Sequence, residues 1–229
     1  MKPYTYLLVN LTCFIIPFLA SFYPKHAFYK NWKPFFKANI IVAFLFIIWD
    51  YLFTRAGVWG FNPEYLSGFY ITNLPIEEIL FFFCIPYACV FTYFAFQFLI
   101  KKNPFQSIHK VITYSIIAFL LIVGLLNFNK LYTSITFISL CILLIIFKLK
   151  KINLSYHYLS YLFILPFFFI SNGILTGSFL VDPIVWYNDA ENLGFRIINI
   201  PIEDMVYGML LVFLNIEMFE YFKSIHKKS

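Results

Sequence analysis

Seven long apolar runs follow one another along the chain, separated by short polar segments. They lie at about residues 4–23, 38–54, 75–100, 111–128, 131–148, 157–176 and 201–222. Most of them are close to the ~20 residues that an α-helix needs to cross the hydrocarbon core of a bilayer. The pattern therefore predicts an all-α, polytopic membrane protein with seven transmembrane helices.

The basic residues are divided unequally between the two sides of such a protein. Thirteen of the 17 lysines and arginines follow the first, third, fifth and seventh runs, namely Lys25, Lys30, Lys33, Lys37, Lys101, Lys102, Lys110, Lys148, Lys150, Lys151, Lys223, Lys227 and Lys228. The other side carries only Lys2, Arg55, Lys130 and Arg196. Because short basic loops stay in the cytoplasm, we expect the N-terminus outside and the C-terminus in the cytoplasm.

Composition excludes a soluble domain. Of the 229 residues, 62% are hydrophobic and 12% are charged, and the mean hydropathy is +0.80. The net charge of +6 comes from loop lysines that set the topology, so no nucleic-acid partner is expected. The four cysteines lie inside apolar runs and the four histidines are scattered, so no metal site is predicted.

A short motif occurs twice and ends each time in paired acids. Residues 68–78 read Gly-Phe-Tyr-Ile-Thr-Asn-Leu-Pro-Ile-Glu-Glu, and residues 194–204 read Gly-Phe-Arg-Ile-Ile-Asn-Ile-Pro-Ile-Glu-Asp. Each copy opens a long apolar run. Carboxylates are costly in such places, so a repeated pair indicates a function.

The spacing of the two copies predicts an internal repeat. They are 126 residues and four helices apart, so both face the same side of the membrane. We expect two parallel three-helix repeats, at residues 1–105 and 130–229, joined by a linking helix at 106–129. Asp50, near the end of the second run, then corresponds to Asn172, near the end of the sixth.

Helix capping is the structural alternative for these motifs. Asn73 or Asn199 can cap a helix, Pro75 or Pro201 suits its first turn, and carboxylates there complement the helix dipole. Capping tolerates many other sequences, however, so two nearly identical copies favour a function.

Paired carboxyls in a poorly hydrated site are suited to proton chemistry. Two adjacent carboxyls do not both ionise easily, whereas a helix N-terminus favours the charged form. Different balances at Glu77, Glu78, Glu203 and Asp204 would leave one group as an acid and another as a base. The chain has no glycine-rich phosphate or dinucleotide motif, so neither a nucleotide nor a flavin is indicated.

The chain resembles the membrane-embedded, flavin-independent lycopene cyclases over essentially its whole length. That family carries a Pro-x-Glu-(Glu/Asp) motif in a three-helix unit, and it needs two units, either as separate subunits, fused in one chain, or within a bifunctional fungal protein. Pro75-Ile76-Glu77-Glu78 and Pro201-Ile202-Glu203-Asp204 both match this motif. The layout is similar to the fused form.

The resemblance implies a redox-neutral cyclisation of the linear ends of lycopene to β-rings, without a cofactor. Proton delivery and removal would belong to Glu77, Glu78, Glu203 and Asp204, in roles left open. The residues expected to bind substrate or orient the acids are Asn73, Asn199, Asp50, Arg196, Pro75 and Pro201. Arg196 is expected to lie beside the second acid pair and keep it ionised.

The resemblance also implies where the protein works and with what. It would be an integral protein of a bacterial cell membrane with lycopene as substrate. Lipid, a second copy of the chain and other carotenoid enzymes are the candidate partners. The main alternative is a small seven-helix transporter with three-plus-one-plus-three parallel repeats, although its acids would be expected nearer the midplane.

Overall fold

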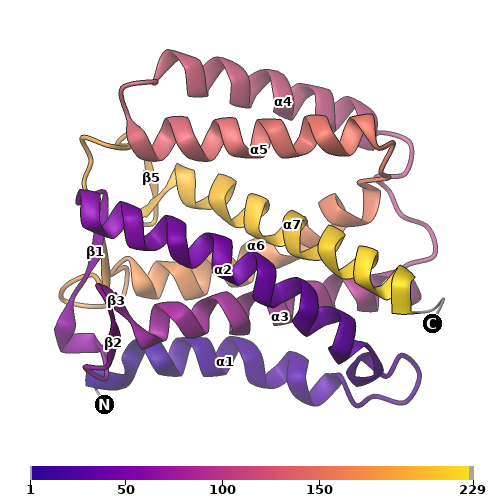
Figure 1. Cartoon of the computed structure of the whole chain (residues 1–229), viewed down its shortest axis with the longest axis horizontal. Coiled ribbons are helices and arrows are strands. Elements are labelled where there is room, and N and C mark those ends of the chain that lie inside the picture. Colours follow the sequence, from indigo (N-terminus) through magenta and orange to yellow (C-terminus); the bar gives the residue numbers. More distant parts are fainter. Residues whose placement is uncertain (1, 227–229) are drawn as a thin grey trace.

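In the part of the chain that the structure describes, seven long helices run alternately in opposite directions (Figure 1). The structure, a computed structural model, describes residues 2–226. In this part of the chain the helices are α1 (Thr5–Ala20), α2 (Trp32–Ala56), α3 (Ile76–Leu99), α4 (His109–Leu126), α5 (Leu131–Leu149), α6 (Ser155–Leu175) and α7 (Ile202–His226). All seven, with the 3₁₀ turn Lys2–Tyr4 counted together with α1, are long and apolar enough to cross a membrane, which confirms the predicted all-α, seven-helix membrane fold.

The helix limits differ most from the prediction at α2. The apolar run predicts a start near residue 38, but the helix begins at Trp32 and contains Lys33 and Lys37 in its first turns. Lysines near the end of a membrane helix can extend their charged groups to the interface, so they do not end the helix.

The same helix pairings occur in both halves of the chain. Helix α1 packs against α3, and α5 packs against α7 in the same way. The halves also exchange contacts, because α2 packs against α7 while α6 packs against α3. Helix α4 lies at the edge of the bundle against α5 (Figure 1). These pairings fit an internal repeat, and the boundaries at residues 105 and 129 stay a prediction.

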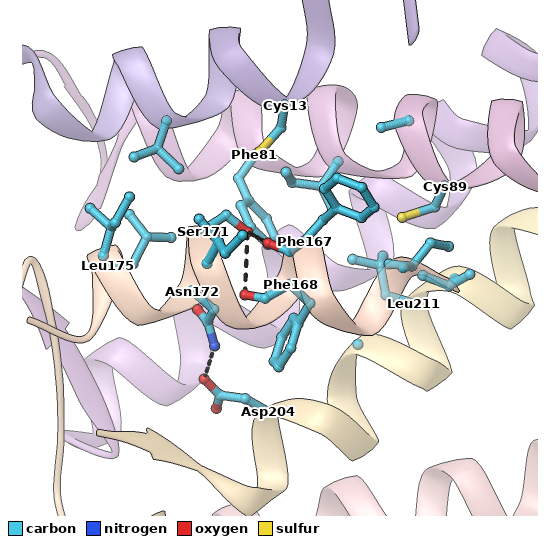
Figure 2. A pocket seen from close by; sticks show the side chains of 18 of the residues that line it. Cys13, Phe81, Cys89, Phe167, Phe168, Ser171, Asn172, Leu175, Asp204 and Leu211 are labelled. Atoms are coloured by element: carbon cyan, nitrogen blue, oxygen red, sulfur yellow. Dashed lines mark hydrogen bonds between the residues drawn. The ribbon is translucent and has the colours of Figure 1, made fainter. Parts of the chain in front are cut away.

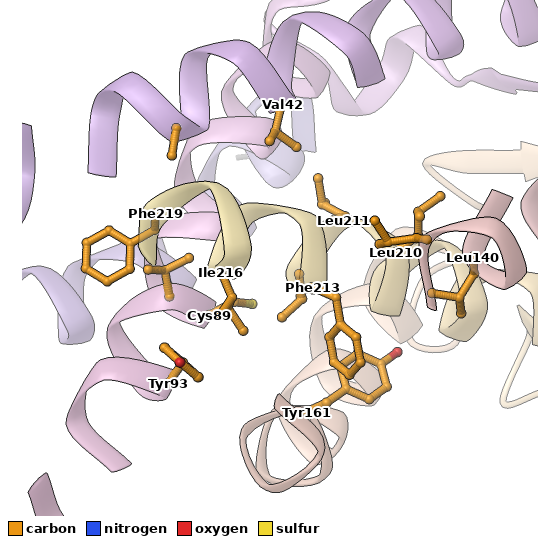
Figure 3. Packing of buried hydrophobic residues seen from close by; sticks show 14 of the residues in the cluster. Val42, Cys89, Tyr93, Leu140, Tyr161, Leu210, Leu211, Phe213, Ile216 and Phe219 are labelled. Carbon is orange, nitrogen blue, oxygen red and sulfur yellow. The ribbon is translucent and has the colours of Figure 1, made fainter. Parts of the chain in front are cut away.

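Helix α7 lies in the middle of the main apolar core and is covered by neighbours on several sides. Four consecutive residues, Leu210–Phe213, are buried, as are Ile216 and Phe219 (Figure 3). Burial around the whole circumference is typical of a central helix. Because lipid is as apolar as these side chains, close packing and buried polar contacts must hold the bundle together.

One such polar contact compensates for a proline. Pro86 lies inside α3 and cannot donate a backbone hydrogen bond to the carbonyl of Phe82 four residues earlier. The amide of Asn39 on α2 donates to that carbonyl at 2.9 Å, and also contacts the side-chain oxygen of Asn215 on α7 at 3.1 Å. Neighbouring helices commonly repair proline breaks in membranes in this way.

Among the described residues, six very short strands gather at the end of the bundle where α3 and α7 begin, which we call the acid end (Figure 1). Strands β2 (Tyr70–Ile71) and β3 (Leu74–Pro75) form a hairpin before α3, and β5 (Arg196–Ile197) and β6 (Ile200–Pro201) form one before α7. Strands β1 (Trp59–Phe61) and β4 (Val185–Tyr187) pair across the two halves. The hydrophobic pattern did not predict these strands, because two or three residues show no periodicity.

Candidate active site

The repeated motif folds as a tight hairpin followed directly by a helix. Gly68 and Gly194 open the two copies with φ angles of 87° and 73°, a conformation that favours glycine. At the helix start, the backbone N–H of Ile76 donates to the carbonyl of Phe69 at 2.9 Å, and that of Ile202 donates to Phe195 at 3.1 Å. The same local structure therefore presents each acid pair.

The first acid of each pair holds the preceding loop. Oε1 of Glu77 accepts from the backbone N–H of Ser67 at 2.7 Å. Oε1 of Glu203 accepts from the backbone N–H of Leu193 at 2.7 Å and from the Thr133 hydroxyl at 2.6 Å. Both carboxyls are fully buried, and neither lines the cavity described next.

The second acid of each pair, Glu78 or Asp204, lines a shared cavity of about 690 Å³. Helices α1, α3, α6 and α7 surround the cavity, and strands β1 and β4 contribute to its acid end. Its wall is mainly apolar and aromatic, with Phe81, Phe167 and Phe168 among the lining residues (Figure 2). The starts of α3 and α7 thus bring one acid each to a single, mainly apolar space.

Asp204 is surrounded by neutral hydrogen-bond donors. Its Oδ1 accepts from the Tyr132 hydroxyl at 2.6 Å. Its Oδ2 accepts from the Asn172 amide at 2.6 Å, visible in Figure 2, and from the Tyr187 hydroxyl at 2.9 Å. Three donors aimed at one carboxyl favour its ionised form, because a carboxylate can accept all of them.

Glu78 has a different set of partners. Its Oε2 accepts from the Tyr6 hydroxyl at 2.5 Å, and its carboxyl is in hydrogen-bonding contact with that of Asp50. Asp50 in turn accepts from the Tyr207 hydroxyl at 2.8 Å. Two carboxyls can form a hydrogen bond only if one of them carries a proton, so this pair is suited to holding one.

The tyrosine partners were not singled out from the sequence, although signals for them were present. Tyr6 and Tyr132 are 126 residues apart, the same spacing as the acid motifs. Tyr187 and Tyr207 stand where the first half has Phe61 and Phe81 at that spacing. Comparing the halves position by position would therefore have found a shared donor at each acid and two hydroxyls added in the second half.

Asp50 and Asn172 occupy the equivalent places that their positions in the sequence indicated. Each reaches the cavity-facing acid of its own half, Asp50 contacting Glu78 and Asn172 contacting Asp204. The equivalent position is therefore a carboxyl in one half and an amide in the other.

The remaining predicted site residues belong to the hairpins. The Asn73 amide donates to the carbonyl of Tyr51 at 3.0 Å, which ties its hairpin to α2, and Asn199 lies in the β5–β6 turn with a φ of 63°. Pro75 and Pro201 are buried in strands β3 and β6. Pro75 holds the N-cap position of α3, so Asn73 is not the cap.

Arg196 does not take the role expected of it. Its guanidinium donates to Asp189 at 2.5 Å and to the carbonyl of Asn199 at 3.0 Å. Among the described residues its hydrogen bonds and ion pair do not include Glu203 or Asp204, because Asp189 supplies the nearer carboxylate. The ion pair lowers the pKa of Asp189.

Tyr187 is a neutral donor at the acid end of the cavity. Burial, with the nearby Asp204 carboxyl as the next cause, raises the pKa of this phenol well above its ordinary value. The hydroxyl therefore keeps its proton and can donate to Asp204 over the whole physiological pH range.

The cavity reaches the surface of the bundle between α1 and α6. Several of its lining side chains on these two helices are also exposed, namely Leu8, Ile16, Phe163, Phe167 and Ile170. Exposed apolar residues on spanning helices face lipid, so the cavity is open toward the membrane interior. Within residues 2–226, no group of His, Cys, Asp or Glu side chains could hold a metal ion.

Comparison with known protein families gives a match in two parts. The family model for lycopene cyclase matches residues 3–96 and, separately, residues 129–222. The two matched segments are offset by 126 residues, the same offset as the acid motifs, which fits an internal repeat. No curated protein and no solved structure matches the chain. Since the matched segments cover most of the 229 residues, the chain belongs to the lycopene cyclase family.

Proposed function

We propose that this protein is a redox-neutral lycopene β-cyclase in which Glu78, paired with Asp50, donates the proton and Asp204 removes it. The observation that carries the proposal is the contrast between two buried acids on one apolar cavity. Glu78 contacts another carboxyl, whereas Asp204 accepts from three neutral donors. When their environments give two carboxyls different preferred protonation states, one commonly acts as the acid and the other as the base.

The reaction needs both roles in sequence. The acid protonates the terminal double bond of a linear lycopene end and leaves a tertiary carbocation. The next double bond attacks this cation and closes a six-membered ring. The base then removes a neighbouring proton, which forms the ring double bond and balances the proton delivered at the start.

The cavity supports this chemistry in two further ways. It opens toward lipid between α1 and α6, where a hydrocarbon substrate is dissolved. Its wall includes the rings of Trp59, Tyr132 and Tyr207 close to the acids, and aromatic faces stabilise a nearby cation. Glu77 and Glu203 then act as positioning residues that hold the loops before each helix.

The distribution of basic residues supports an orientation for this site. We place the acid end at the outer face of the membrane, with the N-terminus outside and the C-terminus in the cytoplasm. The two halves would then be parallel three-helix repeats joined by α4. The family match does not favour the transporter alternative.

Expression in a lycopene-accumulating bacterium tests the function. We expect the red pigment to be replaced by yellow-orange carotene that co-migrates with a β-ring standard. Glu78→Gln and Asp204→Asn should leave lycopene unchanged while the protein is still inserted in the membrane. Unchanged lycopene with inserted wild-type protein would refute the activity, and a cyclic product with another ring type would refute the β-specificity.

A further inference from the structure

A two-stranded ladder closes the acid end of the cavity. Strands β1 and β4 pair in antiparallel fashion, with Trp59 opposite Tyr187, Gly60 opposite Trp186 and Phe61 opposite Val185. Two more backbone hydrogen bonds extend the ladder, from Asn62 to the Ile184 carbonyl at 2.8 Å and from Asn188 to the Val58 carbonyl at 2.9 Å. The ladder therefore fastens the loop after α2 to the loop after α6.

The two faces of this ladder differ in the way that strand alternation requires. Trp59, Phe61, Val185 and Tyr187 occupy alternate positions, and all four line the cavity. Gly60 and Trp186 lie on the opposite face and do not line it. The cavity-facing side of the ladder, which we call the lower face, is thus a mainly apolar cover, and its Tyr187 hydroxyl donates to Asp204.

The opposite side of the ladder, which we call the upper face, adds a second layer to this cover. A Cβ atom built on Gly60 would lie 2.3 Å from the indole ring of Trp186, so this ring rests directly on the strand. Any side chain at residue 60 would displace it. Trp186 is 43% exposed, so its outer side faces away from the protein while its inner side covers the ladder.

The side chains under the ladder leave the cover well packed. Val58 and Ile184, which flank the paired residues, are buried, and Trp59 packs against the rings of Tyr132 and Tyr187. The acids therefore lie beneath apolar side chains rather than beneath an open loop.

We propose that this ladder keeps water from the carbocation and so determines whether the reaction ends in a ring. The inference rests on the proposed cyclase function. A tertiary cation formed beside water would be captured by the oxygen lone pair, forming a C–O bond. Loss of one proton from that oxygen to Asp204 would give a tertiary alcohol, which is lycopene plus one water.

Hydration and cyclisation have the same proton balance in this site. Each consumes one proton from Glu78 and returns one to Asp204, so the acid and base alone do not choose between them. Exclusion of water and the fit of the folded chain must make the choice, as is general for reactive intermediates in closed sites.

Variants that loosen the ladder and leave Glu78 and Asp204 unchanged test whether the ladder excludes water. The variants are Phe61→Ala on the lower face, Trp186→Ala on the upper face, and the two combined. The matched control is Phe179→Ala, an aromatic residue at the same end that is 73% exposed and does not line the cavity. Each purified protein is given lycopene in lipid nanodiscs made in ¹⁸O-labelled water.

We expect ¹⁸O-containing tertiary alcohol from the ladder variants, on the order of a tenth of the reacted ends or more, and none from wild type or the control. Cyclic product alone, or unreacted lycopene from folded protein, in all three variants would overturn the inference. Wild-type protein that leaves lycopene unchanged would instead contradict the proposed function. Trp186→Ala removes a partly exposed side chain, so it tests the inference even if Phe61→Ala fails to fold.

Discussion

The two acid sites have the same local structure and different partners. Each begins with a glycine-started hairpin, and each places a tyrosine hydroxyl, from Tyr6 or Tyr132, on its cavity-facing acid. The sites differ at an equivalent position on α2 and α6, where Asp50 meets Glu78 and Asn172 meets Asp204. A carboxyl neighbour can share a proton, whereas an amide N–H can only donate to a charged or neutral acceptor.

This comparison indicates how a repeated unit can become an acid and a base. The hairpin, the helix start and the tyrosine are the same in both halves, so they supply position. In the proposed mechanism, the neighbour on α2 or α6 sets the preferred protonation state of each acid. The second half also has two hydroxyls, Tyr187 and Tyr207, where the first has phenylalanines at the 126-residue offset.

Removing either acid should have the largest effect. Glu78→Gln and Asp204→Asn each keep the shape of the side chain but lose its proton chemistry. We expect the cyclisation rate to fall by about 10²- to 10⁴-fold, the usual contribution of general acid–base catalysis. Single-turnover product formation by purified protein measures this rate. Rates within a fewfold of wild type would indicate that both residues have a structural role only.

Exchanging the neighbours should sharpen the comparison. Asp50→Asn gives Glu78 an amide donor, and Asn172→Asp gives Asp204 a carboxyl partner, so each single change should cost roughly 10²-fold in rate. The double variant restores one site of each kind with the roles reversed. We expect it to be at least about tenfold faster than the product of the single effects predicts. Simple additivity would show that the neighbours do not set the roles.

Removing one donor to the proposed base, Asp204, should have a smaller effect. Tyr187→Phe leaves Asp204 with two donors, and a hydrogen bond to a charged group contributes about 1.5–3 kcal/mol. We expect the rate to fall by about ten- to a hundredfold, with the larger part in kcat rather than in KM. An effect confined to KM would indicate that Tyr187 binds substrate only.

The first acid of each pair, Glu77 or Glu203, should affect the stability of the protein more than its catalytic rate. Glu203→Ala leaves the N–H of Leu193 and the hydroxyl of Thr133 without their acceptor, which costs about 1–3 kcal/mol in stability. Thermal unfolding in detergent measures this change, and Glu203→Gln, which keeps an acceptor oxygen, is the matched control. Loss of cyclisation in a Glu203→Gln protein of normal stability would show instead that this carboxyl takes part in catalysis.

The smallest effect is expected at Arg196. Its ion pair with Asp189 is largely exposed, so Arg196→Ala should cost less than about 1 kcal/mol. The pKa of Asp189 is lowered in the folded protein, so the stabilisation is present above the ordinary Asp pKa and disappears as pH falls through the lowered value. Melting curves of wild type and variant should therefore differ slightly at neutral pH and converge in acid, and a large loss of activity would contradict this placement.

Much of the fold could be predicted from the sequence, because lipid imposes a simple rule on helix length and polarity. The seven helices follow from the apolar runs, and the acid pairs at the starts of α3 and α7 follow from the repeated motif. The start of α2 was missed because Lys33 and Lys37 lie inside the helix, where a membrane interface tolerates them.

The different placements of the individual site residues could not be predicted as readily. Neighbouring acids such as Glu77 and Glu78 differ only in the direction their side chains take, and the helix start decides this. Arg196 was expected at the acids because of its place in the motif, but the loop between α6 and α7 supplies Asp189 as its partner. The β1–β4 ladder joins residues more than 120 positions apart and leaves almost no periodic signal.

Infrared difference spectroscopy of the resting protein tests the division of roles most directly. The spectrum of wild type minus Glu78→Gln should contain the carbonyl stretch of a protonated carboxylic acid, which shifts in heavy water. The spectrum of wild type minus Asp204→Asn should lack this band and show the loss of a carboxylate instead. A protonated carboxyl band that is lost in Asp204→Asn and kept in Glu78→Gln would contradict the account.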